Sequence, residues 1–193
     1  MITLKLTTYH CNKVPEAIEN YVPQNLAVKM RRQAFVVWSV FALLIFAWIF
    51  SIVLAPIAEA SGSKSVAQPI YKFFSFICHQ IDGRSFHVEE HPLAVCSRCF
   101  GVYCGLLFGF LIYPLIRRIE ETEPFPRFWL FLAMIPMGVD WSLGFFDVWA
   151  NTHWSRFFTG AILGAACGLF IVPALVELFQ LAASRRQGKK LSG

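Results

Sequence analysis

Three cysteines in the middle of the chain have the type and spacing for metal or redox chemistry: Cys78, Cys96 and Cys99. In a helix, the last two would place their sulfurs one turn apart on the same face. Zinc sites commonly combine such a pair with ligands about 15–20 residues away. The pattern predicts a site for zinc or a similar divalent ion, whose fourth ligand would be His79, His87, His91 or Asp140.

The same cysteines allow two other interpretations. A C-x-x-C pair at the start of a helix, beside Arg98, favours thiolates, because the helix dipole and the guanidinium both stabilise negative charge. Four-helix membrane oxidoreductases that pass electrons from thiols to quinone present cysteines in this way, so a quinone-coupled thiol–disulfide oxidoreductase is an alternative function. A structural disulfide is the third interpretation. Cys104 and Cys167, inside apolar runs, are expected to be plain packing residues.

Polar residues beside and within the apolar runs define a second candidate site. Asp140 lies inside an apolar run, where an ionisable side chain is expensive and is usually paired or functional. An ion pair with Arg98 or Arg156 would join two helix ends. Alternatively, several arginines would form a pocket for phosphate or carboxylate, since guanidinium binds both through two hydrogen bonds. The residues of this predicted pocket are Gln80, Arg84, Arg98, Tyr103, Asp140 and Arg156.

The composition is that of a membrane protein. Charged residues make up only 15% of the chain, against about 25% in a soluble domain, and the mean hydropathy is +0.55. The net charge of +5 comes from Lys and Arg beside apolar runs. This distribution carries topology information and excludes a nucleic-acid-binding face.

Four apolar runs are long enough to cross a bilayer as helices, which takes about 20 residues. The predicted fold is therefore an all-α, polytopic membrane protein with four transmembrane helices. The predicted organisation is an N-terminal segment 1–32, helices 33–56, 96–116, 128–147 and 156–182, connecting segments 57–95, 117–127 and 148–155, and a tail 183–193.

The distribution of Lys and Arg predicts the orientation. Twelve of these 17 residues would share one side of the membrane with the N-terminus, and five would lie on the other side. Because cytoplasmic segments carry the excess of positive charge, both termini are predicted to be cytoplasmic. The segment with the cysteines then faces outward.

The second and fourth runs share a glycine pattern. Each has glycine at every fourth position, followed five residues later by proline. Such spacing lets helix backbones approach closely, so we expect these two helices to pack together, or the chain to form homo- or hetero-oligomers, through glycine faces. The shared pattern also raises the hypothesis of two parallel helical-hairpin repeats. The glycines are Gly101, Gly105, Gly109, Gly160, Gly164 and Gly168.

These residues resemble a known family, the domain-of-unknown-function 2085 family of small prokaryotic membrane proteins. The resemblance covers roughly residues 70–181. Its first block falls on Cys78, His79, Gln80, Arg84, Ser85, Phe86, Cys96, Arg98, Cys99, Gly101, Tyr103 and Gly105, and a second on Asp140, Ser155, Arg156, Thr159 and Gly160. The resemblance implies a prokaryotic plasma membrane location and implies that His79 belongs to the site, which makes the metal set Cys78, His79, Cys96 and Cys99. It implies no reaction.

The sequence thus predicts an outward-facing Cys/His metal site with an arginine pocket, in a membrane protein that acts on an anionic or lipid-linked substrate. Membrane lipids are the expected partners. The alternatives are the quinone-coupled oxidoreductase and an accessory subunit of a larger membrane complex.

Overall fold

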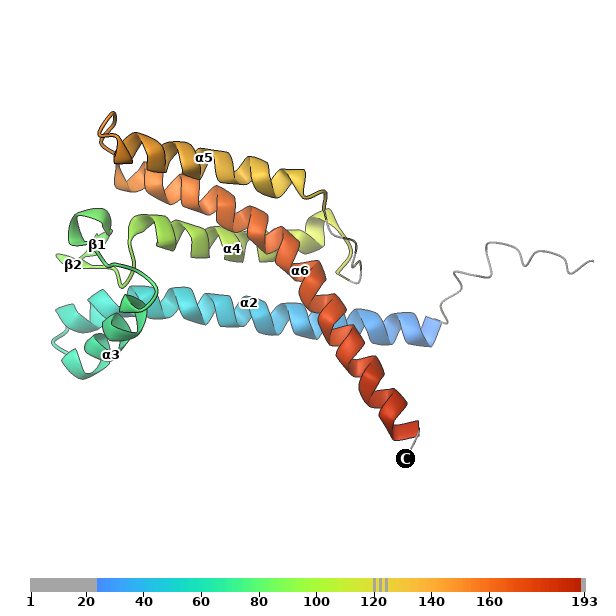
Figure 1. The fold of residues 1–193 in the computed structure, drawn as a ribbon. Helices are drawn as coiled ribbons and strands as arrows, with labels where there is room; N and C mark the ends of the chain where they lie inside the picture. The colour runs from blue at the N-terminus through green and yellow to red at the C-terminus, as the bar shows by residue number, and fades with distance from the viewer. Residues whose placement is uncertain (1–23, 120, 122, 124, 192–193) are drawn as a thin grey trace, which may run out of the picture.

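The structure is a computed structural model of the 193-residue chain and describes residues 24–119, 121, 123 and 125–191. It contains four long helices, α2 (Gln24–Ala60), α4 (Ser97–Ile116), α5 (Phe128–Phe145) and α6 (His153–Leu191). Figure 1 shows α2, α4 and α5 running roughly along one axis, with the first half of α6 between α5 and α4 and its second half crossing the bundle. The predicted all-α fold is confirmed. Most of the N-terminal segment 1–32 lies outside the described residues.

Each long helix is long and apolar enough to cross a membrane. The four candidate spans are Val28–Ala60, Ser97–Ile116, Phe128–Phe145 and His153–Ala182. Large apolar side chains are exposed along them, including Leu43, Leu115 and Phe131, as expected where lipid covers the surface. The 37 residues of α2 extend about 55 Å, which exceeds the roughly 30 Å of bilayer hydrocarbon. The sidedness of these helices and the internal repeat stay predictions.

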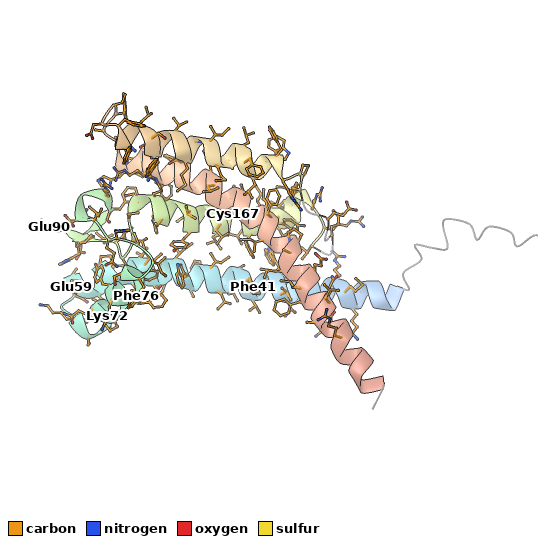
Figure 2. The ribbon with its side chains drawn as sticks, in the orientation of Figure 1. Phe41, Glu59, Lys72, Phe76, Glu90 and Cys167 are labelled. Carbon is orange, nitrogen blue, oxygen red and sulfur yellow. The ribbon has the colours of Figure 1, made fainter. Side chains whose placement is uncertain are left out.

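The segment between the first two spans was predicted only as a connection, yet it contains a helix and two short strands of its own. The amphipathic helix α3 (Lys64–Ser75) buries Ala67 and Phe74. A short 3-10 helix, η1 (Asp82–Arg84), precedes the antiparallel strands β1 (His87–Val88) and β2 (His91–Pro92). Figure 2 shows Glu59, Lys72 and Glu90 at this end of the molecule, whereas Phe41 and Cys167 lie in the middle of the bundle.

The closest helix pair is α4 with α6, which run in the same direction (Figure 1). A Cβ atom at Gly101, Gly105 or Gly109 would overlap the carbonyl oxygen of Phe157, Ala161 or Ala165, respectively. In return, Gly160, Gly164 and Gly168 face the carbonyl oxygens of Arg98, Val102 and Leu106. Two backbones therefore lie in direct contact along three turns, with room for hydrogen atoms only.

This contact has two consequences. The glycine faces meet within one chain, so they are not free for the predicted oligomer contact. The parallel contact also brings the first residues of α4 beside those of α6. The remaining helices pack around this pair: α5 contacts α6, and α2 contacts α3, α4 and α6.

We predict that Gly105→Ala lowers the free energy of unfolding by about 1–3 kcal/mol, because the new methyl group meets a backbone carbonyl that cannot rotate away. Gly138→Ala in α5 is the matched control, since no atom lies within 4 Å of its Cβ position. It should leave stability unchanged or raise it slightly. Thermal unfolding in detergent measures both, and equal midpoints for the two variants would contradict the packing.

Candidate metal centre

The sulfur atoms of Cys78, Cys96 and Cys99 all lie within 4.8 Å of one another. Cys78 follows α3, and its backbone N–H donates to Phe74 O at 2.9 Å. Cys96 is the N-cap residue of α4, and Cys99 lies in the first turn of that helix. Tetrahedral zinc with Zn–S bonds of about 2.3 Å separates its sulfurs by about 3.8 Å. The three side chains are thus close to the arrangement that zinc requires, and all three are free thiols.

Hydrogen bonds stabilise the thiolate form of Cys78. The thiol groups of Cys96 and Cys99 hold the pKa of Cys78 well below its usual value, and the backbone N–H groups of Cys96 and Gln80 add to the effect. Burial acts in the opposite direction and is outweighed. The Cys96 amide nitrogen is 3.2 Å from the Cys78 sulfur. A thiolate that accepts backbone N–H groups is prepared for a metal ion.

Gln80 joins the two chain segments that carry the cysteines. Its side-chain Nε2 donates to Tyr71 O at 2.8 Å and to Ala94 O at 2.7 Å. Tyr71 itself donates from its hydroxyl to Pro92 O at 2.6 Å. Gln80 also has a positive φ of 48°, which a residue with a side chain adopts only when its surroundings hold it there.

An apolar core supports the cysteines from below. Cys78 is only 6% exposed and belongs to a buried cluster with side chains from α2, α3 and the segment before α4. The other members are Ile52, Ala55, Phe74, Leu93, Ala94 and Val95. Cys96 and Cys99 are partly buried and pack against this cluster.

Among the described residues, no fourth protein ligand joins the three sulfurs. His79 lines the same cavity, yet its ring nitrogens do not lie within 4.8 Å of all three sulfurs. His87 lies 3.0 Å from Asp82, and His91 belongs to the strand pair. Asp140 forms an ion pair with Arg98. The ligand group of the structure therefore consists of the three cysteines, and the assignment of His79 to the metal stays a prediction.

A cavity of about 570 Å³ lies directly beside the three sulfurs. One part of its lining is polar and carries the cysteines and the arginines, and the other part is apolar. Besides the cysteines, the polar residues are His79, Gln80, Arg84, Arg98, Asp147, Asn151 and Arg156, and the large apolar ones are Ile77, Ile81, Trp141 and Phe145. The rings of Trp141 and Phe145 are stacked, with centroids 5.1 Å apart. The cavity is therefore suited to a molecule with a polar and an apolar part.

The three arginines of the cavity have different partners. Arg98 forms an ion pair with the buried carboxylate of Asp140, which also accepts a hydrogen bond of 2.9 Å from the Ser155 hydroxyl. Arg84 and Arg156 have no ion-pair partner among the described residues, and their charges act on each other. The Nε atoms of Arg98 and Arg156 are buried without a hydrogen-bond acceptor in the described part of the chain. Arg84 and Arg156 thus bring positive charge to the cavity without an ion-pair partner in the described part of the chain.

The structure brings four of the six predicted pocket residues to the cavity: Gln80, Arg84, Arg98 and Arg156. Asp140 and Tyr103 do not line it. Asp140 lies behind the wall and holds Arg98, so of the two arginines that the sequence offered as its partner, Arg98 forms the ion pair. Tyr103 packs against the apolar core, with its ring centroid 5.8 Å from that of Trp48.

Sequence reasoning missed the residues that α5 and the following loop contribute. Asn151 donates from Nδ2 to Asp140 O at 2.5 Å, and this bond ties the loop to α5. Gly144 makes room for it, since a Cβ there would meet the Asn151 side chain. The spacing of Trp141 and Phe145, four residues apart on one helix face, was a sequence signal that could have indicated this aromatic pair.

Comparison with known proteins identifies the family. The family model described as "Predicted membrane protein (DUF2085)" matches residues 78–170. An uncharacterized protein of Methanocaldococcus jannaschii is 36% identical over 133 residues, which are 66% of this chain and 85% of that protein. The chain belongs to the DUF2085 family. An uncharacterized protein of Methanothermobacter thermautotrophicus is 30% identical over 104 residues, 54% of this chain and 90% of that protein.

The family resemblance that the motifs carried is thus confirmed. No solved structure matches the chain. The DUF2085 match begins at Cys78 and includes all three cysteines and all three arginines of the cavity, together with the glycine contact of α4 and α6. The helices α2 and α3 lie outside the matched region, although they supply much of the apolar core below the cysteines.

We predict that Gln80→Ala weakens zinc binding by this DUF2085 protein by about 10–100-fold, because the segment with Cys78 loses its two side-chain bonds to the rest of the site. Competition with a chromophoric chelator measures the affinity. Gln68→Ala, at an exposed position of α3, is the control and should bind as the wild type does. Unchanged affinity in Gln80→Ala would show that the glutamine does not position the cysteines.

Proposed function

We propose that the protein is a metal-binding membrane protein in which Cys78, Cys96 and Cys99 hold zinc or a similar divalent ion. The observation that carries this proposal is the group of three sulfurs within 4.8 Å, one of them stabilised as a thiolate, next to a cavity. We also propose that the site faces the extracytoplasmic side of a prokaryotic plasma membrane, as the distribution of Lys and Arg predicts.

Three protein ligands and a neighbouring cavity favour a reactive site over a structural one. Structural zinc sites are closed by four protein ligands, whereas catalytic sites keep one position for water or substrate. Cys96 and Cys99 both line the cavity, so the fourth position of a bound ion would face it. His79, which also lines the cavity, is the residue of this chain best placed to occupy or regulate that position.

The arginines make an anion the best-supported substrate. Arg84 and Arg156 lack ion-pair partners, and the buried Nε atoms of Arg98 and Arg156 lack acceptors in the described part of the chain. A phosphate or carboxylate in the cavity would pair with the positive charge of Arg84 and Arg156. Asp140 forms its ion pair with Arg98 and its charge also acts on Arg156, so this one carboxylate does not offset the positive charge of all three guanidinium groups.

The apolar part of the lining makes a lipid-linked anion the preferred class. Ile77, Ile81, Trp141 and Phe145 lie around the same cavity and are exposed by 46–66% of their surface. A small polar anion would leave these side chains without a partner. An anion on an apolar chain would contact both parts, with its charged group at the arginines and its chain along the rings of Trp141 and Phe145.

Metal content tests the first part of the proposal. Purified wild-type protein is expected to contain about one zinc or similar ion per chain, and Cys96→Ser or Cys99→Ser to lose it, because two remaining thiolates do not hold the ion. Cys104→Ser and Cys167→Ser are matched controls that should keep the metal, since neither belongs to the group of three sulfurs. Elemental analysis of each variant provides the measurement.

The same samples distinguish the redox alternative. Three neighbouring sulfurs would also suit disulfide exchange, in which one thiolate attacks a disulfide between the other two. A quinone-coupled oxidoreductase would be isolated without metal, with two of these cysteines oxidised and reducible by mild thiol. That result would replace the metal proposal, whereas bound metal with all three thiols protected from alkylation would support it.

Arg156 tests the anion site. We predict that Arg156→Lys folds and keeps its metal but binds farnesyl phosphate at least about tenfold more weakly, because lysine keeps the charge and loses the two-pronged donor. Arg127→Lys, exposed at the other end of α5, is the control and should bind normally. Titration in detergent measures both, and equal binding by wild type and Arg156→Lys would remove Arg156 from the site.

A further inference from the structure

A second group of cations lies at the end of the bundle opposite to the cysteines. Figure 1 shows the beginning of α2 and the end of α4 at this end of the bundle. Residues of these two segments line a groove of about 750 Å³. The groove is lined by Val28, Arg31, Arg32, Phe35, Pro114, Arg118 and Ile119. Arg32 also lines an adjoining cavity of about 410 Å³ between α2 and α6, together with Lys29 and Gln180.

The charged side chains that line the groove are all positive among the described residues. In that part of the chain no Asp or Glu lines the groove or the cavity beside it, and Arg31, Arg32 and Arg118 have no ion-pair partner. Arg117, next in sequence to Arg118, is different: its Nη1 donates to Glu123 O at 2.8 Å, and its guanidinium lies 4.3 Å from the Phe125 ring centroid. Arg117 thus finds partners within the protein, whereas the described residues supply no ion-pair partner for the three arginines of the groove.

A further donor at this end lacks an acceptor. The Nε2 atom of Gln180, which lines the smaller cavity, is buried and has no hydrogen-bond partner among the described residues. Arg32 and Gln180 therefore line one cavity, and Gln180 carries an unpaired donor next to it. A buried amide without an acceptor is costly unless a ligand or water supplies one.

Apolar side chains complete the groove. Val28 and Phe35 of α2 are 68% and 53% exposed, and Pro114 and Ile119 lie across from them. These residues stand at the ends of two candidate membrane spans, where a bilayer crossed by these helices would have its headgroups. Positive side chains beside apolar ones at this depth match the chemistry of an anionic lipid.

We infer that the groove between α2 and α4 binds the headgroup of an anionic phospholipid. The phosphate lies at Arg31, Arg32 and Arg118, and the acyl chains follow Phe35 and Pro114 into the membrane. A plain topology anchor would need positive charge only and no groove. The site is separate from the proposed metal centre and does not depend on it.

Lipid binding by the purified full-length protein in detergent tests the inference. The probes are short-chain phosphatidylglycerol, phosphatidylcholine of the same chain length, and inorganic phosphate, and native mass spectrometry with thermal unfolding is the readout. We expect wild type to bind phosphatidylglycerol at least about tenfold more tightly than phosphatidylcholine, and inorganic phosphate to have no effect. Equal binding of the two lipids overturns the inference, and so does an equal effect of inorganic phosphate, which would indicate a site for free anions.

Charge-matched variants locate the binding. The triple variant Arg31→Gln, Arg32→Gln and Arg118→Gln should lose the preference, whereas Lys64→Gln, Lys72→Gln and Arg127→Gln, which removes three exposed cations elsewhere, should keep it. Preference retained by the first variant, or lost equally by both, contradicts a defined site. If the triple variant does not fold, the single variant Arg118→Gln replaces it, because Arg118 lies beyond the end of α4. This variant should reduce the preference for phosphatidylglycerol about threefold, and an unchanged preference also contradicts the site.

Discussion

The direct contact between the backbones of α4 and α6 is the constraint on which the rest of the molecule depends. Glycine at every fourth position on both helices lets carbonyl oxygens of one helix approach the Cα atoms of the other. Because the helices are parallel, this contact sets the N-cap residue Cys96 and the first-turn residues Arg98 and Arg156 at the same end of the bundle. A bulkier residue along the contact would move the cysteines relative to the arginines.

Two further interactions complete the cavity from opposite sides. The ion pair of Arg98 with Asp140 connects α4 to α5, and the bonds from Ser155 and Asn151 to Asp140 connect α5 to the start of α6. On the other side, Gln80 attaches the segment with Cys78 to the segment before α4. These polar bonds hold the walls, and the apolar core below the cysteines excludes water from the rear of the site.

The two ends of the bundle differ in how many carboxylates lie near their arginines. At the cysteine end, Asp140 pairs with Arg98 and Asp147 also lines the cavity, while Arg84 and Arg156 have no ion-pair partner among the described residues. At the opposite end, Arg31, Arg32 and Arg118 line a groove to which the described residues contribute no carboxylate. A membrane protein with an anion site at each end would contact anionic groups in both leaflets, one as proposed substrate and one as surrounding lipid.

The sequence by itself determined the four apolar helices, the family and the C-x2-C pair, because these depend on composition, hydrophobic length and local spacing. The sequence left Arg98 and Arg156 as possible ion-pair partners of Asp140. Only the tertiary structure identifies Arg98 as the partner, since this depends on how helices α4, α5 and α6 are rotated. Tyr103 and Asp140 belong to the same sequence motifs as the cavity residues but do not line the cavity, and residue spacing alone could not show this. The approach of Cys78 to Cys96 and Cys99, and the contribution of Asn151, likewise depend on contacts between distant segments. Such contacts form only when side chains from several helices are packed together in three dimensions.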